Sequence, residues 1–130
     1  MSKEDLTPSE TEWLVMEKLW ESAIPLTSAE IISRLEGDKK MSPKTVRVLL
    51  NRLGQKKIVD YTIDKKDSRV YHYFAVKSKE ECLKEKSRHF AESYFKGSRT
   101  GAMAALVDSF DLDEGQMKEL WDILKEKNKG

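Results

Sequence analysis

The stretch SPKTVRVLLNRL, residues 42–53, carries both a helix start and an apolar face. Ser42 can cap the first backbone N–H groups, and Pro43 fits the first helical position, where its missing N–H costs nothing. Apolar side chains recur at the i, i+3, i+4 and i+7 positions of a helix buried on one side, namely Val46, Leu49, Leu50 and Leu53. The sequence therefore predicts a helix here whose opposite face is exposed.

The exposed face of this predicted helix is polar and basic. Lysine and arginine side chains reach guanine acceptors, asparagine pairs with adenine, threonine serves either purpose, and valine can contact a thymine methyl group. The N-terminal end of a recognition helix usually points at the bases, and Ser42 with its neighbouring amides can bind phosphate. We therefore predict a DNA recognition helix whose contact residues are Ser42, Lys44, Thr45, Arg47, Val48, Asn51 and Arg52.

Two further helix starts precede this stretch. Thr7 and Glu10 predict a helix capped at Thr7, with Glu10 completing a capping box. Thr27 and Glu30 predict a second, short helix by the same device. In a helix-turn-helix, the helix before the recognition helix crosses the DNA backbone. We therefore expect Thr27 and Ser28 to lie near phosphate groups.

A hairpin is predicted after the third helix. Residues 58–63 and 69–76 are rich in valine, isoleucine, tyrosine and phenylalanine, which is typical of strands, and 64–68 form a polar turn. Three helices followed by a hairpin is the element order of a winged helix-turn-helix. In such a wing, basic side chains can hold phosphates of the adjacent groove. The candidates are Lys65, Lys66 and Arg69.

The rest of the chain is predicted to be helical, over 79–95, 101–110 and 113–127. The last of these helices has an apolar stripe that finds little local partner. The fold class is therefore mainly α with one small β-hairpin. We predict a winged-helix DNA-binding domain over 1–77 and a separate helical region over 78–130.

Charge is unevenly distributed along the chain, although the formal net charge is only +1. Residues 39–57 contain seven lysines and arginines and no acid, whereas 107–126 contain seven acids against two lysines, a net charge of −5. A basic middle and an acidic end are expected when one surface meets an anion and another stays away from it.

Other function classes find little support. No run approaches the roughly 18 apolar residues of a membrane span, and the N-terminus is acidic and polar. The single cysteine, Cys82, excludes an internal disulfide and suits a reducing cytoplasm. Neither Cys82 nor His72 and His89 has the spacing of a metal site or a catalytic set. We expect a soluble cytoplasmic protein that is not an enzyme and uses no cofactor or metal.

Four segments in order along the chain resemble the penicillinase-repressor family, which includes the methicillin-resistance and copper-responsive repressors. They are LTPSETEWLVMEKLW (6–20), MSPKTVRVLLNRL (41–53), YFKG (94–97) and DLDEGQMKELWDIL (111–124). The resemblance implies a homodimeric repressor that binds a palindromic operator, with recognition helices roughly 34 Å apart or a multiple of it. It implies a dimer interface formed by Phe90, Tyr94, Met103, Leu106, Val107, Leu112, Met117, Leu120, Trp121 and Leu124.

The resemblance also bears on how DNA is released. In the antibiotic-responsive branch, a membrane sensor leads to cleavage of the repressor in the small helix after the Lys-Gly pair. The matching bond here is Ala105–Leu106, although the Asn-Phe pair of the family is missing. The copper-responsive branch ends in a cysteine cluster that this chain lacks. The inducing signal stays open.

Two departures from the family concern the end of the recognition helix. Gly54 stands where members often have a larger residue, and Lys57 where they often have the glycine that closes the helix. Because an interior glycine costs about 1 kcal/mol relative to alanine, we expect the helix end to shift or fray.

Two alternatives remain beside the repressor. A winged helix can serve as a protein-interaction module whose basic face binds an acidic partner, in which case affinity for duplex DNA would not depend on sequence. A small-molecule-sensing regulator would hold a ligand in its dimer cavity, and Trp121 fluorescence would report the binding.

Overall fold

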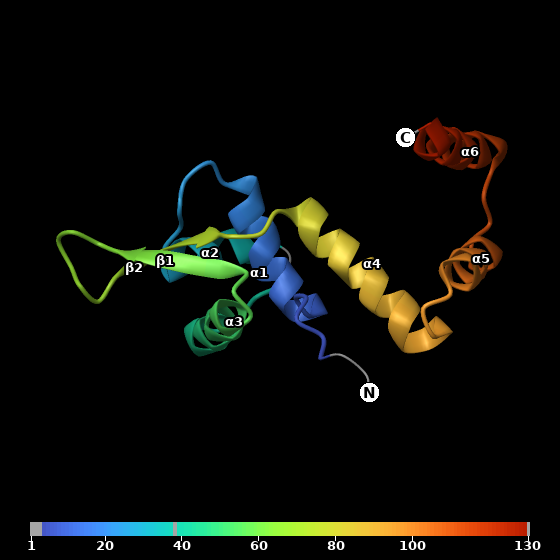
Figure 1. Cartoon of the computed structure of the whole chain (residues 1–130). Helices are drawn as coiled ribbons and strands as arrows, with labels where there is room; N and C mark the ends of the chain where they lie inside the picture. The colour runs from blue at the N-terminus through green and yellow to red at the C-terminus, as the bar shows by residue number, and fades with distance from the viewer. Residues whose placement is uncertain (1–3, 38, 130) are drawn as a thin grey trace. The chain divides into compact units, whose positions relative to one another are not determined.

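The computed structural model describes residues 4–37 and 39–129, which form six helices and one two-stranded antiparallel sheet (Figure 1). The elements are α1 (Glu10–Glu21), α2 (Ser28–Leu35), α3 (Pro43–Gln55), β1 (Val59–Ile63), β2 (Tyr71–Ala75), α4 (Lys79–Phe95), α5 (Arg99–Ser109) and α6 (Glu114–Lys129). The predicted fold class, three helices and a hairpin followed by further helices, is confirmed.

The described residues fall into two compact units that meet within α4. One runs to Ser87 and the other begins at Arg88. We call them the winged-helix unit and the C-terminal unit. The functional division into residues 1–77 and 78–130 is a different claim and stays a prediction.

One hydrophobic core holds the winged-helix unit together. The four apolar residues predicted to form the inner face of α3 are all buried in it, with exposed fractions of 0 to 4%. The indole N–H of Trp20 donates to the Lys77 carbonyl at 2.9 Å, and Trp20 also packs edge-to-face on Trp13. The core consists of Val15, Met16, Leu19, Leu26, Ile31, Leu35, Met41, Val46, Leu49, Leu50, Leu53, Ile58, Val59 and Cys82.

The helix starts agree with the sequence at two of three positions. Thr27 caps α2 in a capping box with Glu30, and Ser42 caps α3. The prediction for α1 is wrong, since the cap is Ser9, whose capping box uses Glu12. The Thr7 hydroxyl instead donates to the Asp5 carboxylate, so it is not available for the helix.

The end of α3 is closed and continuous, so the expected fraying is wrong. The helix passes through Gly54 to Gln55. The Ile58 N–H then donates to the Leu53 carbonyl and the Lys57 N–H to the Gly54 carbonyl, both at 3.0 Å. This is the Schellman pattern, whose turn residue must be left-handed. Lys57 takes that position with φ 63°.

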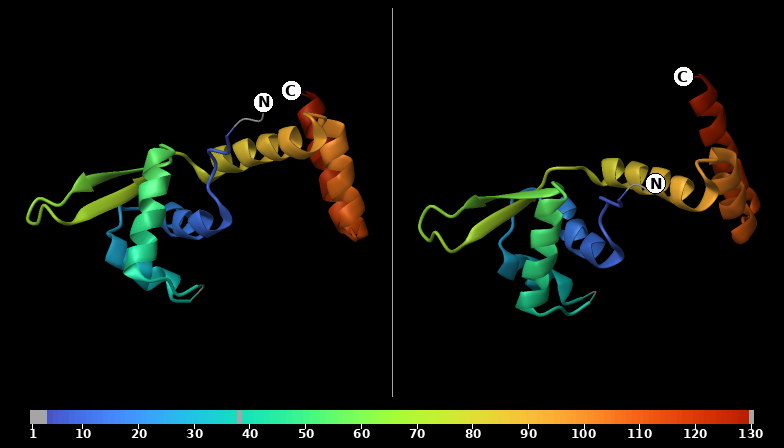
Figure 2. Two further views of the ribbon diagram at one scale, coloured as in Figure 1. Left: turned by 90° about the horizontal axis from the view of Figure 1, so that it is seen from below. Right: turned by 60° about the horizontal axis from the view of Figure 1, so that its bottom comes forward.

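The hairpin pairs β1 with β2, and Tyr61 lies opposite Tyr73. Strand β2 starts at Tyr71, two residues later than predicted, because Arg69 belongs to the turn, where its backbone N–H donates to the Asp67 side chain. Leu26 extends the sheet by a bridge to Tyr73. In both views of Figure 2 the hairpin lies crosswise to α3, and its tip extends beyond the helix.

The C-terminal unit is built differently. Helix α6 has no buried residue, and Ala102 is the buried residue of α5. Asp113 begins α6 by accepting the Gln116 N–H at 2.8 Å, while the Gln116 side chain accepts the Asp113 N–H at 3.0 Å. None of the described helices combines the length and the hydropathy that crossing a bilayer requires.

Candidate nucleic-acid interface

The outer face of α3 is exposed as predicted. Lys44, Thr45, Arg47, Asn51 and Arg52 are all classed as exposed. Val48 is 40% exposed, although it is apolar. The helix therefore presents donors, an amide and one apolar contact on a single surface, because the leucines of its other face are fixed in the core.

Side-chain bonds organise the N-terminal end of this face. The Ser42 hydroxyl accepts the Thr45 N–H at 3.1 Å and lies 2.9 Å from the Thr45 hydroxyl. One of these two hydroxyls donates to the other, and the second keeps its donor for a ligand. The Nε of Arg47 donates to the Pro43 carbonyl at 3.4 Å, which leaves the terminal guanidinium N–H groups directed to other acceptors.

Arg47 also lies close to the hairpin. Burial raises the pKa of Tyr73, and the neighbouring Tyr71 and Tyr61 add to the rise, whereas the positive charge of Arg47 works against it. Tyr73 is therefore a protonated donor at neutral pH. The proximity joins the face of α3 to the tyrosines of the sheet.

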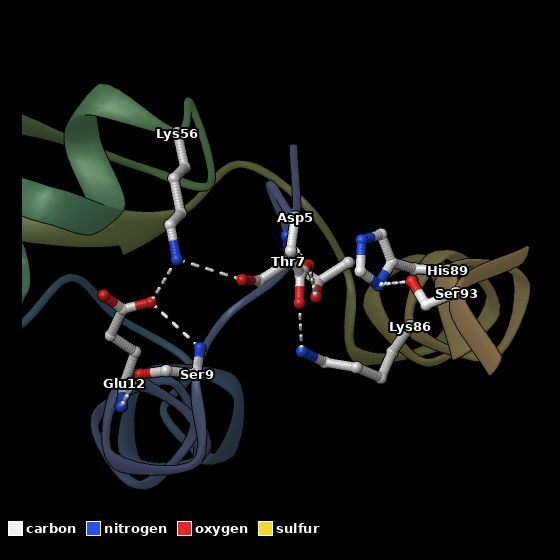
Figure 3. Close-up of polar contacts among 8 residues, drawn as sticks. All are labelled: Asp5, Thr7, Ser9, Glu12, Lys56, Lys86, His89 and Ser93. Carbon is white, nitrogen blue, oxygen red and sulfur yellow. Dashed lines mark hydrogen bonds and ion pairs between the residues drawn. The ribbon is translucent and has the colours of Figure 1, made fainter. Parts of the chain in front are cut away.

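The basic residues between 39 and 57 divide into two groups in space. Within the described part of the chain, the side chains of Lys44 and Arg52 form no ion pair. Lys56, by contrast, is only 21% exposed in its side chain and donates to the Glu12 carboxylate at 2.6 Å and to the Thr7 carbonyl at 3.0 Å (Figure 3). Its charge stabilises the fold and does not contribute to a DNA surface.

The N-terminal segment has a second polar anchor. The Asp5 carboxylate accepts the Thr7 N–H at 2.9 Å and the Lys86 ammonium at 3.2 Å (Figure 3). Burial alone would raise the pKa of Asp5, but the hydrogen bonds from Thr7 and the charge of Lys86 hold it at about 2. Asp5 is therefore ionised across the physiological range.

The start of α2 is engaged in its own cap. The Thr27 hydroxyl accepts the Glu30 N–H at 3.2 Å, and the Glu30 carboxylate accepts the Thr27 N–H at 2.9 Å. These hydrogen bonds, the backbone one first, lower the pKa of Glu30. Thr27 and Ser28 are both half-buried. The carboxylate at this end is a barrier to phosphate that the sequence prediction did not consider.

The hairpin tip offers two cations and not the three predicted. Lys65 and Lys66 are exposed. Arg69, although 89% exposed in its side chain, forms two bonds to the Asp67 carboxylate, at 3.0 and 3.2 Å. The hydrogen bonds from Arg69 lower the pKa of Asp67, which keeps the pair charged.

Asp64 holds the turn itself. Its carboxylate accepts the N–H groups of Lys66 and Asp67 at 2.9 and 3.0 Å and lies 2.9 Å from the His72 ring. The bond from His72, followed by the two backbone bonds, lowers the pKa of Asp64. The two acids of the turn are thus internal partners, and they set its shape.

Three tyrosines on one face of the hairpin were not among the predicted contact residues. Tyr61, Tyr71 and Tyr73 form one aromatic cluster. Their alternation along two strands was a usable signal, because residues two apart in a strand share a face. A polar tip drew the prediction to the lysines instead.

The remaining reactive side chains form no catalytic or metal site in the described part of the chain. No group of three or more histidine, cysteine, aspartate or glutamate side chains there is arranged to hold a metal ion. Cys82 is buried, and burial, followed by the charge of Glu85, raises the pKa of its thiol. A thiol of raised pKa is a poor nucleophile.

The C-terminal unit carries an apolar groove of about 380 Å³ between α5 and α6. Six of the ten predicted interface residues line or border it, while Phe90 and Tyr94 lie on α4 and Met103 and Leu106 elsewhere on α5. Phe110 was missed by the prediction, although it is 60% exposed. The groove is lined by Val107, Phe110, Asp111, Leu112, Met117, Leu120, Trp121 and Leu124.

Comparison with known proteins gives a consistent result. A family model described as Penicillinase repressor matches residues 8–126. The methicillin resistance regulatory protein MecI of Staphylococcus aureus is 29% identical, over 92% of this chain and 94% of its own. The penicillinase repressor of S. aureus is 29% identical over 99% of each chain. A mutant of S. aureus MepR shares the fold, with a TM-score of 0.54 at 19% identity, over 93% of this chain and 78% of its own.

Proposed function

This chain belongs to the penicillinase repressor family, and from that membership we propose that it is a sequence-specific, DNA-binding transcriptional repressor. The family consists of transcriptional repressors and not of enzymes. The observation that carries the proposal is the outer face of α3, which is exposed, basic and fixed by a buried opposite face. Since its target is chromosomal DNA, we place the protein in the cytoplasm.

The proposed contacts differ in their chemistry. Lys44, Thr45 and Arg47 read base edges, with Val48 against a thymine methyl group and Asn51 available to adenine. Electrostatic contacts to phosphate come from Arg52, Lys65 and Lys66. Contributions from Thr27, Ser28, Ser42 and Arg69 are smaller, because these side chains lie at half-buried positions or already hold partners within the chain.

We further propose that the protein acts as a homodimer on a palindromic operator. The support is the apolar groove of the C-terminal unit, whose exposed side chains include Met117 at 50%, Trp121 at 59% and Leu124 at 47%. Exposed apolar surface of this kind favours association. A second copy of the chain can cover it symmetrically, and the two-fold axis then matches the operator.

Release by proteolysis is the third part of the proposal, and it has a structural requirement. The Ala105–Leu106 bond lies inside α5, and the Ser109 hydroxyl donates to the Ala105 carbonyl at 2.6 Å. Proteases act on locally opened chain, so α5 must unwind first. The shallow packing of α5, in which Ala102 is the buried residue, makes such opening easier. The proposed partner is a membrane sensor that leads to the cleavage.

Competition binding tests the DNA-binding function. The chain is mixed with labelled DNA from its own upstream promoter and challenged with unlabelled promoter or scrambled DNA at about 0.15 M salt. We expect a preference of roughly 10³ or more for the promoter, in the range of specific regulators. Equal, weak binding to both would contradict the proposal and favour an acidic protein partner for the basic face.

The variant Arg47→Ala tests base readout by α3. If Arg47 reads a base, its loss should weaken operator binding by about 1–3 kcal/mol and relax the choice of base at one position. The control is Arg88→Ala, which removes an exposed arginine of α4. Equal weakening on operator and random DNA would make Arg47 a phosphate contact, and equal effects of the two variants would remove its special role.

A further inference from the structure

The tyrosine cluster of the hairpin is exposed in an unusual way. The rings of Tyr61 and Tyr71 stack with centroids 4.4 Å apart and planes within 9°. Tyr73 lies against Tyr61 at 5.8 Å. Yet Tyr61 is 45% exposed and Tyr71 36% exposed, and Ile63 beside them is 54% exposed. The result is an amphipathic surface of three phenol groups and one isoleucine.

This surface continues the core face of the sheet outward. Val59 pairs with Ala75, Tyr61 with Tyr73, and Ile63 with Tyr71, and alternate residues share a face. The first pair packs in the core with the leucines of α3. The later pairs follow as the hairpin runs crosswise to α3 and beyond it (Figure 2).

A helix that lies in the major groove has a sugar–phosphate backbone on each side, because the groove is only about 12 Å wide. A hairpin that leaves the end of such a helix sideways must cross one of these backbones. The face of the hairpin continuous with the α3 surface, near Arg47, is the one carrying Tyr61, Tyr71 and Tyr73.

We propose that the hydroxyl groups of Tyr61 and Tyr71 bind phosphate oxygens of the DNA backbone beside the groove entered by α3. This inference rests on the proposed DNA-binding function and adds a contact to it. Phenol hydroxyls donate to phosphate, and their rings cover the apolar edge of deoxyribose. The stacking fixes both rings before binding, so little side-chain entropy is lost.

The contact has a signature that separates it from the lysines of the tip. An uncharged donor releases no counterion when it meets a phosphate, so it adds affinity without changing the salt dependence of binding. Lys65 or Lys66 would instead change the slope of log K against log salt by about 1 for each phosphate contacted.

The cluster could also serve the hairpin alone, since cross-strand aromatic pairs stabilise sheets. The substitutions Tyr61→Phe and Tyr71→Phe separate the two roles, because they keep the rings and remove only the hydroxyls. Thr62→Val is the matched control. It also deletes a hydroxyl from an exposed residue of β1, but on the opposite face of the sheet.

Operator affinity is measured for the full-length wild type and these variants at several salt concentrations, with thermal unfolding as a check on the fold. We expect Tyr61→Phe and Tyr71→Phe each to bind the operator about tenfold more weakly, the size of a lost hydrogen bond to a charged group. Their salt slope and melting temperature should equal those of the wild type. Thr62→Val should bind like the wild type.

The outcomes separate this inference from the proposed function. If the wild type prefers its operator and both phenylalanine variants bind as tightly, the tyrosine contact is refuted while the repressor stands. An equal loss in Thr62→Val would also refute it, since the effect would not belong to one face. A wild type without operator preference would overturn the proposed function, and this inference with it.

Discussion

The two units of this chain place their apolar side chains in opposite ways. In the winged-helix unit, large residues such as Met16, Leu35 and Leu53 are fully buried. In the C-terminal unit Ala102 is the buried residue among those described, whereas Phe110 is 60% exposed and Trp121 59% exposed. A comparable share of apolar residues thus yields a closed core in one unit and an open groove in the other.

This difference says where the stability of each unit comes from. Buried apolar surface contributes roughly 25 cal/mol per Å² within a single chain, so the winged-helix unit has its own source of stability. A unit that leaves such surface open gains it only on association, and its stability then depends on protein concentration. The DNA-reading part is preformed, and the C-terminal part becomes stable by pairing.

The largest expected effect tests the closed core. Leu53→Ala removes a fully buried side chain of α3, and we expect it to lower the free energy of unfolding by about 2–5 kcal/mol, because a cavity remains. Urea unfolding followed by circular dichroism, at protein concentrations tenfold apart, measures this. The loss should be the same at both concentrations.

The matched control for Leu53 is Leu83→Ala on α4. Leu83 is 47% exposed, so its truncation leaves no closed cavity and should cost well under half as much as that of Leu53. Similar losses in the two variants would mean that the core of the winged-helix unit is not the main source of its stability.

The groove of the C-terminal unit is tested next. Trp121→Ala should weaken self-association by about 2 kcal/mol or more, since buried tryptophans are typical hot spots of interfaces. Analytical ultracentrifugation over a range of concentrations gives the dimer dissociation constant. The unfolding of the winged-helix unit should change little.

Ile123→Ala is the control for Trp121. It removes an apolar side chain from the same helix that is 62% exposed and outside the groove. If it weakens association as much as Trp121→Ala, the contact surface lies elsewhere on α6. Dimers unaffected by either change would refute the interface assignment.

The sequence predicted those features that depend on local periodicity or local capping. The inner face of α3, the caps at Thr27 and Ser42, and the hairpin all follow from residues within one or two turns of each other. The cap of α1 was different, because Thr7 and Ser9 each precede a glutamate by three positions. A local pattern cannot choose between two overlapping capping boxes.

Long-range contacts made that choice, and no sequence pattern showed them. Glu12 accepts both the Ser9 N–H and the ammonium of Lys56, 44 positions away. The same contact removes Lys56 from the basic surface, although residues 39–57 contain no acid. The charge of a segment is therefore an upper bound on the charge of the surface it forms. The tyrosine face needed the sheet register as well as the composition.

The smallest expected effect concerns Lys57, which holds the left-handed position that closes α3. A side chain there costs roughly 1–2 kcal/mol, whereas glycine adopts this conformation freely but loses more entropy on folding, by about 0.5–1 kcal/mol. Lys57→Gly should therefore raise the free energy of unfolding by about 0.5–1 kcal/mol. Urea unfolding of the full chain, at a concentration where it is fully dimeric, measures the gain.

Lys40→Gly is the matched control, because it makes the same change of composition and charge at an exposed residue without positive φ. There only the entropic cost remains, so this variant should be slightly less stable than the wild type. Self-association should stay unchanged in both, since the gain at Lys57 belongs to the winged-helix unit alone. A Lys57→Gly variant that is destabilised like Lys40→Gly would show that the lysine is not strained and that the hydrogen bonds of the Schellman turn, rather than its φ angle, determine how α3 ends.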